Sequence, residues 1–329
     1  MRERLVRAGA PERVDGLVLG SGDDAAITER SGAVATSVDA LVEGVHFRIP
    51  PFTLEDVGHK ALATALSDLA AMGASAREAY VQLGLPPERA EGALALADGM
   101  GPLAAEHGVA IAGGDVTRAA ELFCAVTVVG AAGPGGLVRR AGARPGDVLA
   151  VTGEVGGAAA GLLTLGQEEP GEGLAAGLLA ALRSRQLRPS PRIGAGLRLA
   201  ELGATAMIDL SDGLGGDARH LARASGVGIR IELDRLPVQE GVAEVASAAG
   251  RDVHDLVLGG GEDYELLVAV PPQALSAAAE ALGDEGVGLT EIGSVTEGED
   301  VVFSRSDGEV VRASGYDQLR SSRSPRGRA

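Results

Sequence analysis

Short apolar runs followed by closely spaced carboxylates recur along the whole chain and constrain its fold more than any other feature. The first of these segments is Gly20-Ser21-Gly22-Asp23-Asp24, which follows the apolar stretch Gly16-Leu17-Val18-Leu19. Later carboxylates of the same kind, most of them flanked by Gly or Ser, are Asp39, Asp68, Asp115, Asp209, Asp212, Glu262 and Asp263. Apolar runs of four to eight residues bounded by turn residues are typical of buried strands. We therefore expect strands that present acidic side chains in the connections after them.

Such carboxylates predict a cation site. Two unit charges about 4 Å apart repel each other by roughly 4 kcal/mol at an effective dielectric constant of 20. The stability of the fold alone therefore gives no reason to place these carboxylates close together. Hard oxygen ligands collected from several loops are the ligands that Mg²⁺ and Ca²⁺ prefer.

Charge and composition exclude several classes of function. The net charge of −17 argues against binding nucleic acid, and an anionic substrate would need cations as mediators. Lys60 is the only lysine among 29 basic residues, so the chain has no Gly-x-x-x-x-Gly-Lys phosphate loop. Cys124 is the only cysteine, which excludes an intrachain disulfide and a thiolate metal site.

No membrane segment is expected. The N-terminus lacks the charged and then apolar pattern of a signal peptide, and the longest uncharged run, 122–138, is interrupted by Gly and Pro. We expect a soluble, cytoplasmic protein, with a disordered Ser- and Arg-rich tail over 321–329.

The order of the predicted elements favours a mixed α/β fold with two domains. Length alone predicts two domains of ordinary size. The Gly- and Pro-rich stretch 131–136 marks their boundary, which gives domains over 1–134 and 135–320. Predicted strands are 33–38, 79–85, 109–112, 123–129, 148–153, 206–209, 227–233 and 264–270. Predicted helices include one from the N-cap Thr53 to about Met72, 87–107, 193–202 and one that ends near Ala224.

Some polar residues have both a structural and a functional interpretation. Asp68 lies beside the apolar stripe of its helix, so it is either a ligand or part of an internal cap or ion pair. Ser211 or Asp212 could be an N-cap, but capping needs only one of them, which leaves Asp209 as surplus. His46 could be a structural histidine. The pair Arg139-Arg140 could be solvated or could bind phosphate.

Six segments in this order resemble the thiamine-monophosphate kinases, a family within the aminoimidazole ribonucleotide synthetase-like superfamily. The segments are Gly22-Asp23-Asp24-Ala25, Asp39 to Phe47, Leu66 to Ala74, Gly113-Gly114-Asp115, Ile208 to Leu214 and Gly260 to Leu266. The resemblance covers about residues 16–319. It implies an N-terminal α/β domain that dimerises through its sheet, a C-terminal α/β domain, and an active site between them. The implied reaction is ATP-dependent, Mg²⁺-assisted phosphorylation of thiamine monophosphate to the diphosphate.

The resemblance also implies roles for individual residues, none of them a catalytic side chain. Implied metal ligands are Asp23, Ser37, Val38, Asp39, Asp68, Asp115, Asp209 and Asp212. Implied ATP contacts are Gly114, Asp115, Arg140 and Ser211, and implied contacts with thiamine monophosphate are His46, Glu262 and Tyr316. Relatives usually carry Thr where Val38 stands, so only a main-chain carbonyl could serve at that position.

Two alternatives stay open at this point. Another synthetase of the superfamily, of the aminoimidazole ribonucleotide synthetase kind, is the alternative enzyme. A non-catalytic acidic cation-binding protein would explain the carboxylates, but not why His46, Arg140 and Tyr316 accompany them.

Overall fold

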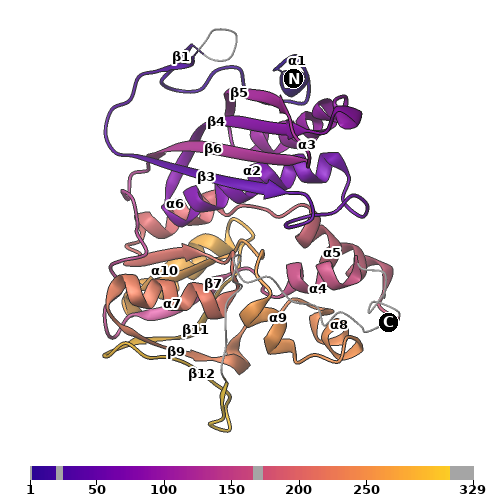
Figure 1. Cartoon of the computed structure of the whole chain (residues 1–329). Helices are drawn as coiled ribbons and strands as arrows, with labels where there is room; N and C mark the ends of the chain where they lie inside the picture. Colours follow the sequence, from indigo (N-terminus) through magenta and orange to yellow (C-terminus); the bar gives the residue numbers. More distant parts are fainter. Residues whose placement is uncertain (1, 20–24, 166–172, 312–329) are drawn as a thin grey trace.

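Two separate sheets divide the chain at the segment between Ala132 and Val148 (Figure 1). This computed structural model describes residues 2–19, 25–165 and 173–311. The predicted boundary between 134 and 135 falls inside the connecting segment, and the predicted tail over 321–329 lies outside the described residues. Both halves mix helices with strands, so the predicted α/β fold class is confirmed.

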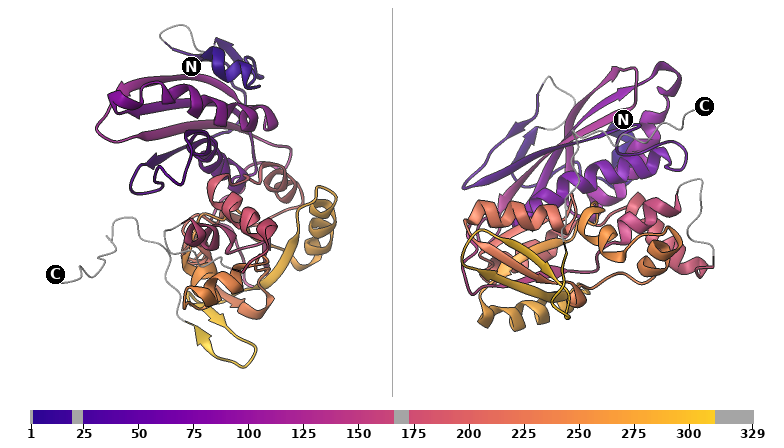
Figure 2. Two further views of the ribbon diagram at one scale, coloured as in Figure 1. Left: turned by 90° about the vertical axis from the view of Figure 1, so that its right-hand side faces the viewer. Right: turned by 60° about the horizontal axis from the view of Figure 1, so that its bottom comes forward.

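The N-terminal half contains a four-stranded sheet with helices on one face (Figures 1 and 2). Its strand order is β3 (Val34–Val42), β6 (Phe123–Ala132), β4 (Ala74–Leu85) and β5 (Ala110–Arg118). The helical segments are α1 (Arg2–Arg7), α2 (Leu54–Ala71), η1 (Pro87–Arg89) and α3 (Gly92–Glu106), and β1 (Leu17–Leu19) pairs separately with β2 (Ile27–Thr28).

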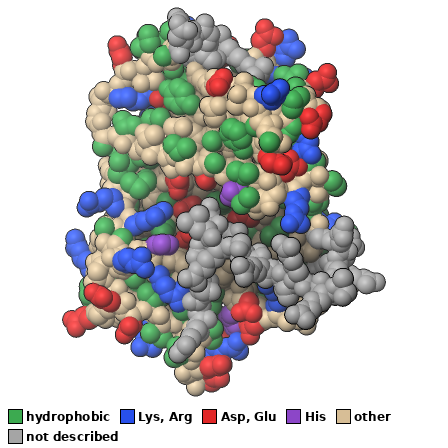
Figure 3. Space-filling view, viewed as in Figure 1, with side chains coloured by type: hydrophobic (Ala, Val, Ile, Leu, Met, Phe, Trp, Pro, Cys, Tyr) green, Lys and Arg blue, Asp and Glu red, His purple; other side chains and the backbone are tan. Residues whose placement is uncertain are grey.

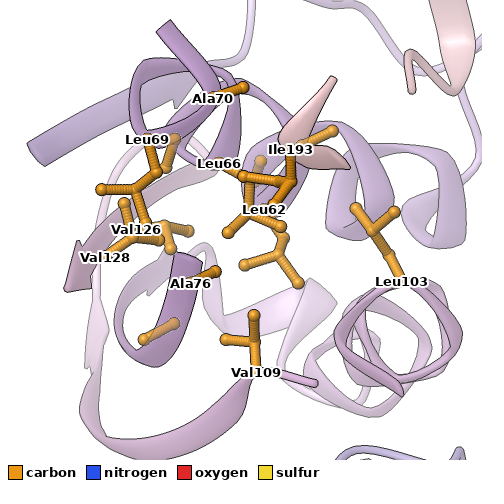
Figure 4. Close-up of a cluster of buried hydrophobic side chains, with 14 of the residues drawn as sticks. Leu62, Leu66, Leu69, Ala70, Ala76, Leu103, Val109, Val126, Val128 and Ile193 are labelled. Atoms are coloured by element: carbon orange, nitrogen blue, oxygen red, sulfur yellow. The ribbon is translucent and has the colours of Figure 1, made fainter. Parts of the chain in front are cut away.

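Helix α2 begins where the sequence predicted and carries the core of this half. Thr53 accepts a hydrogen bond from the Asp56 N–H, and the Asp56 carboxylate accepts one from the Thr53 N–H, which closes a capping box. The apolar face of α2 packs against β6, with Leu66 and Leu69 near Val126 and Val128 (Figure 4).

Helices α2 and α3 approach each other closely at two glycines. A Cβ atom at Gly58 would lie 2.0 Å from the carbonyl oxygen of Leu96, and one at Gly99 would lie 1.9 Å from that of Glu55. Only glycine fits at these positions, which explains part of the high glycine content.

The prediction that the acidic residues follow the ends of strands was wrong for two of the strands. Asp39 lies inside β3, and Gly114 and Asp115 lie inside β5. Strand β3 pairs with β6 over all nine of its residues, so backbone pairing continues beyond the apolar run. The expected helix 87–107 also differs, because it starts as the 3-10 turn η1 before α3 begins at Gly92.

The C-terminal half is built on a seven-stranded sheet. Its strand order is β13 (Val310–Val311), β12 (Val301–Ser304), β9 (Gly228–Glu232), β11 (Leu289–Thr296), β7 (Val148–Thr152), β10 (Leu266–Val270) and β8 (Ala206–Asp209). All pairings are antiparallel except β9 with β12. The helical segments are α4 (Gly157–Thr164), α5 (Ala176–Leu187), α6 (Ile193–Glu201), α7 (Leu214–Ser225), η2 (Leu233–Arg235), α8 (Val242–Ala248), α9 (Val253–Gly259) and α10 (Pro272–Gly283).

The two halves pack tightly through α2 and α6. A Cβ atom at Gly196 of α6 would lie 2.0 Å from the carbonyl oxygen of Ala70 in α2. One hydrophobic cluster contains residues of both halves, including Leu66 from α2 and Leu199 from α6. Within the described part of the chain, none of the helices has the length and apolar character needed to span a bilayer.

Candidate active site between the two halves

A pocket of about 860 Å³ lies where the two halves meet. Its walls come from β3 and the segment after it, from α2 and α4, from the end of β8, and from the Gly-rich turn before β10. Lining residues include Asp39, His46, Phe52, Asp68, Leu162, Asp209, Ser211, Asp212, Glu262 and Tyr264. Figure 3 shows acidic side chains and a histidine gathered along the boundary between the upper and lower halves.

Four of the predicted metal ligands meet in this pocket, and we call Asp39, Asp68, Asp209 and Asp212 the acidic cluster. Asp39 shares its face of β3 with Ser37, whose hydroxyl donates a hydrogen bond to the Asp68 carboxylate on α2. The Ser67 hydroxyl of α2 donates to Asp209 over 2.8 Å. The cluster therefore joins the N-terminal half to the C-terminal half.

Burial and mutual repulsion raise the pKa values of two carboxylates in this cluster. Burial, and then the charge of Asp39, raises the pKa of Asp68, although the Ser37 hydroxyl and Arg140 oppose the shift. Burial, and then the charge of Asp68, raises the pKa of Asp209 to about 7. A bound cation would favour the ionised form of both groups and reverse these shifts.

The donor set of the cluster fits a hard divalent cation. Carboxylate oxygens backed by serine hydroxyls are the ligands that Mg²⁺ prefers, and Mg²⁺ usually combines one or two carboxylates with substrate phosphates. Among the described residues, no three acidic, histidine or cysteine side chains converge as a complete metal site.

The turn before β10 forms one wall of the pocket. The Glu262 N–H donates to the Ser211 carbonyl over 2.9 Å, and the Tyr264 N–H donates to the Leu210 carbonyl over 2.9 Å. Glu262 and Tyr264 both have a positive φ, at 62° and 52°, which is uncommon for residues other than glycine. These contacts hold the Glu262 side chain beside the acidic cluster.

The other carboxylates of this turn serve the fold. Asp263 accepts hydrogen bonds from the N–H groups of Gly156 (2.7 Å) and Ala158 (3.0 Å) at the start of α4. The Glu265 carboxylate is fully buried and pairs with Arg185 at 2.9 Å and Arg192 at 2.6 Å. We refer to residues 262–265 as the partnered segment.

His46 lies where it can donate into the pocket. The Val42 N–H donates to Nδ1 of the ring over 3.0 Å, so the neutral ring carries its proton on Nε2. The functional interpretation of His46 therefore has a geometric basis, because Nε2–H is a donor suited to a phosphate oxygen.

The adjacent arginines Arg139 and Arg140 of the connecting segment differ in their surroundings. The charge of Arg140 opposes the raised pKa values of Asp68, Asp209 and Asp217, so it lies within electrostatic reach of the acidic cluster. Arg139 is not among the main charges that act on these groups, and its carbonyl accepts a hydrogen bond from the Met207 N–H. Of these two arginines, the structure therefore favours Arg140 as the one that acts on the acidic cluster.

Several predicted site residues do not line the pocket of their own chain. The side chain of Val38 is 65% exposed on the opposite face of β3 from Asp39. Gly114 and Asp115 lie in β5, at the opposite edge of the sheet from β3, where Asp115 accepts from Gln82 over 3.4 Å. Asp23 and Tyr316 lie outside the described residues.

The capping alternative for the segment after β8 was wrong. The N-cap of α7 is Gly213, and it makes no side-chain capping hydrogen bond. Ser211 and Asp212 instead line the pocket. A buried carboxylate that the sequence analysis missed, Asp217, accepts a hydrogen bond from the Asp212 N–H over 3.1 Å. Burial, and then the charge of Asp209, raises its pKa to about 8.

Sequence reasoning also missed Lys60 and Gln186, which contact Glu262 from behind the pocket wall. Lys60 offered one signal, because a single lysine in a chain of many arginines stands on the same helix as Asp68. Gln186 offered no signal in the sequence.

Comparisons with known proteins identify the family of the chain. Residues 22–132 match the AIR synthase related protein N-terminal domain, and residues 144–305 match the corresponding C-terminal domain. The thiamine-monophosphate kinase of Mycobacterium tuberculosis is 41% identical over 270 residues, which cover 80% of this chain and 78% of that protein. The Escherichia coli K12 kinase is 39% identical over 307 residues, which cover 92% of both proteins.

Solved structures give the same result. The thiamine-monophosphate kinase of Stenotrophomonas maltophilia superposes with a TM-score of 0.83 at 35% identity, covering 94% of this chain and 96% of that one. A ThiL structure complexed with AMPPCP and TMP superposes with a TM-score of 0.75 at 33% identity, covering 86% of each chain. These matches, together with the two domains of the AIR synthase related type, show that the chain belongs to the thiamine-monophosphate kinase family.

Proposed function

We propose that this protein transfers the terminal phosphoryl group of ATP to the phosphate of thiamine monophosphate, forming thiamine diphosphate. The observation that carries the proposal is the acidic cluster, which meets His46 and Glu262 in one pocket between the two halves. Thiamine-monophosphate kinases match most of this chain at 35–41% identity. This similarity favours the kinase over another synthetase or a plain cation-binding protein.

Mg²⁺ is the proposed cofactor. Asp39, Asp68, Asp209 and Asp212 would hold it together with the phosphates. The rest of the proposed set is Asp23, Ser37, Asp115 and the main chain of Val38. Bound Mg²⁺ would neutralise charge on the phosphates and align the attacking and leaving oxygens. Since the acceptor is already an ionised phosphate oxygen, the chain needs no strong general base. Its own residues therefore act by binding, orienting and balancing charge.

The nucleotide side of the site is assigned to Arg140 and Ser211. Arg140 supplies positive charge near the cluster, and the Ser211 hydroxyl lies in the pocket wall beside Asp212. A guanidinium group can bind phosphate oxygens in a bidentate manner, which compensates for the missing phosphate-loop lysine.

The acceptor side is assigned to His46 and Glu262, with Tyr316 as a further contact. The Nε2–H of His46 would donate to the phosphate of thiamine monophosphate, and Glu262 would accept from a donor on the rest of the substrate. Phe52 and Tyr264 give this part of the pocket an aromatic wall suited to a heterocyclic ligand.

A homodimer is part of the proposal. The face of the N-terminal sheet opposite the helices carries exposed apolar side chains such as Val34 (38% exposed) and Val38 (65%), and Figure 3 shows this hydrophobic surface in the upper half. Gly114 and Asp115 lie at the sheet edge away from the pocket of their own chain. A second copy packed on this face could bring them to the site.

The reaction is tested by incubating purified protein with ATP, Mg²⁺ and thiamine monophosphate and measuring thiamine diphosphate by chromatography. We expect diphosphate to form in step with ADP and to require Mg²⁺. ADP formation without diphosphate, or no reaction with this acceptor, would contradict the proposal.

Sedimentation at micromolar concentration tests the dimer. We expect about twice the chain mass, and Val38→Asp on the exposed face should shift the protein towards monomer because it buries a charge in the interface. A wild-type monomer would contradict the dimer and leave the reaction to be judged by its own assay.

A further inference from the structure

Lys60 is a fully buried lysine with three defined contacts. Its Nζ atom lies 2.8 Å from Oε1 of Glu262, donates to the Gln186 carbonyl over 3.1 Å, and lies 5.4 Å from the centre of the Phe52 ring. A buried ammonium group is costly unless it is paired and hydrogen-bonded. The surroundings of Lys60 satisfy both conditions, so the charge is built into this site.

The partner carboxylate is held at both oxygens. While Oε1 of Glu262 pairs with Lys60, Oε2 accepts a hydrogen bond from Gln186 Nε2 over 2.7 Å. The side chain of Glu262 is still 24% exposed, and it lines the pocket. A carboxylate has about four lone-pair positions, so Glu262 retains acceptor capacity toward a ligand.

The backbone at Glu262 is strained, which argues against a purely structural role. Its φ of 62° lies in the left-handed region, and strained non-glycine residues cluster at functional sites where surrounding contacts hold them. The Lys60 ion pair and the hydrogen bond from the Glu262 N–H to Ser211 are the contacts that hold it here. A salt bridge needed only for packing would not require this backbone.

Lys60 also reaches from one half of the molecule to the other. On α2, Asp56, Lys60 and Ser67 are spaced by four and seven residues, so they lie on one face of the helix. Each contacts the C-terminal half: Asp56 pairs with Arg188 at 2.5 Å, and Ser67 donates to Asp209 at 2.8 Å. The acidic cluster and Glu262 are thus tied to the same helix face.

We propose that Lys60 is a positioning residue, which fixes the Glu262 carboxylate in the pocket wall as a charge-balanced hydrogen-bond acceptor for thiamine monophosphate. The inference rests on the proposed function, in which Glu262 faces the acceptor substrate. An unpaired Glu262 would add a negative charge to a pocket that must admit a phosphate. With Lys60 behind it, Glu262 offers an acceptor without that added repulsion.

The first test is Lys60→Met, which keeps the length of the side chain and removes its charge. We expect the KM for thiamine monophosphate to rise about tenfold, and the KM for ATP to stay within about twofold. Because this change leaves the Glu262 carboxylate without its cation, the melting temperature should fall, but less than for a fully buried carboxylate, since Glu262 is 24% exposed and water can solvate it in part. Gln186→Leu, which releases the other oxygen of Glu262, should produce a smaller rise in the same KM.

A double-mutant cycle separates positioning from packing. Glu262→Gln should raise the same KM and also lower the melting temperature, because it leaves the buried charge of Lys60 without its partner. Adding Lys60→Met should restore the melting temperature and leave the KM at the level of Glu262→Gln alone, because both changes act through one carboxylate.

His59→Ala is the matched control. His59 is the neighbour of Lys60 on α2, and its Nε2 contacts the Pro189 carbonyl in the C-terminal half at 3.0 Å, away from Glu262. It should change the melting temperature without raising the KM for thiamine monophosphate.

The outcomes distinguish two failures. If Lys60→Met and Gln186→Leu leave this KM unchanged, or raise both KM values equally, the positioning role is overturned. If Glu262→Gln leaves the KM for thiamine monophosphate unchanged, the assignment of the acceptor side is wrong. Calorimetric titration of thiamine monophosphate decides the case for any variant that binds without turnover.

Discussion

The acidic cluster and the partnered segment use the same residue types in opposite ways. In the partnered segment, Glu262 pairs with Lys60, and Glu265 pairs with Arg185 and Arg192. Among the described residues, neither Asp68 nor Asp209 of the cluster forms a salt bridge; their hydrogen-bond donors are serine hydroxyls. Each of these carboxylates of the segment thus has a cationic partner, whereas those of the cluster repel one another until a ligand arrives.

The pKa values reflect this difference. Burial raises the pKa of Asp263 in the partnered segment to about 6, while Arg185 and two backbone N–H groups oppose the shift. In the cluster, the charge of Asp68 adds to burial and raises the pKa of Asp209 to about 7. The strongest neighbouring charge therefore favours ionisation of Asp263 in the partnered segment and opposes ionisation of Asp209 in the cluster.

The largest expected effect separates turnover from stability in the cluster. Asp209→Asn and Asp212→Asn should each reduce kcat at least a thousandfold, roughly 4 kcal/mol in activation free energy. In EDTA, the melting temperature should stay equal or rise, because one of several repelling charges is gone. A large loss of melting temperature in both variants would show that these carboxylates belong to the fold.

The opposite result is expected in the partnered segment. Glu265→Gln leaves Arg185 and Arg192, which are 17% and 21% exposed, without their shared carboxylate. Removing one partner of a buried ion pair costs about 3–5 kcal/mol, and partial exposure of the arginines favours the lower end. Thermal unfolding should show a loss of roughly 5–10 °C. The KM values of the remaining folded enzyme should stay close to those of the wild type, and a selective loss of turnover would contradict the comparison.

The metal-free protein should lose stability as the pH rises from about 4 to about 7. Asp209 binds its proton more tightly in the folded state than in the unfolded state, so deprotonation in this window favours unfolding. Thermal melts at pH 5 and pH 8 in EDTA, at equal ionic strength, measure the effect. Asp209→Asn should make the fall smaller, and Mg²⁺ should reduce it at pH 8. An identical pH dependence in wild type and variant would refute the assignment.

The general architecture could be predicted from the sequence because local patterns determine it. The capping box at Thr53 and Asp56 placed the start of α2, and the apolar runs placed the buried strands of the second sheet. The extent of β3 could not be predicted, because its outer positions are exposed and its length depends on pairing with β6.

The acidic members of the site could be predicted, but their different roles could not. Asp209 and Glu265 look alike in the sequence, and only the fold brings two arginines from α5 and the α5–α6 connection to one of them. Lys60 and Gln186 lie in helices distant in sequence from Glu262, so their contact depends on how the halves pack. The separation of Asp115 from Asp39 likewise follows from strand order rather than from any local pattern.

The smallest expected effect concerns Arg140, whose positive charge opposes the raised pKa values of Asp68 and Asp209 in the cluster. Arg140→Ala should weaken ATP binding about tenfold, because ATP carries about four negative charges into a site that is already acidic. The loss should be larger at low Mg²⁺, since the cation and the arginine screen the same repulsion and therefore act cooperatively with the nucleotide. Affinity for thiamine monophosphate should change less.

Arg139→Ala is the control for this prediction, because Arg139 is adjacent in sequence and equally exposed, but it is not among the main charges that shift the pKa values of the cluster. Calorimetric titrations of ATP and of thiamine monophosphate, each at two Mg²⁺ concentrations, compare the two variants. Equal losses in both variants would mean that the overall positive charge of the connecting segment matters, not the position of Arg140. ATP binding that is indifferent to Mg²⁺ would contradict the view that the acidic cluster needs a cation before it can accept a nucleotide.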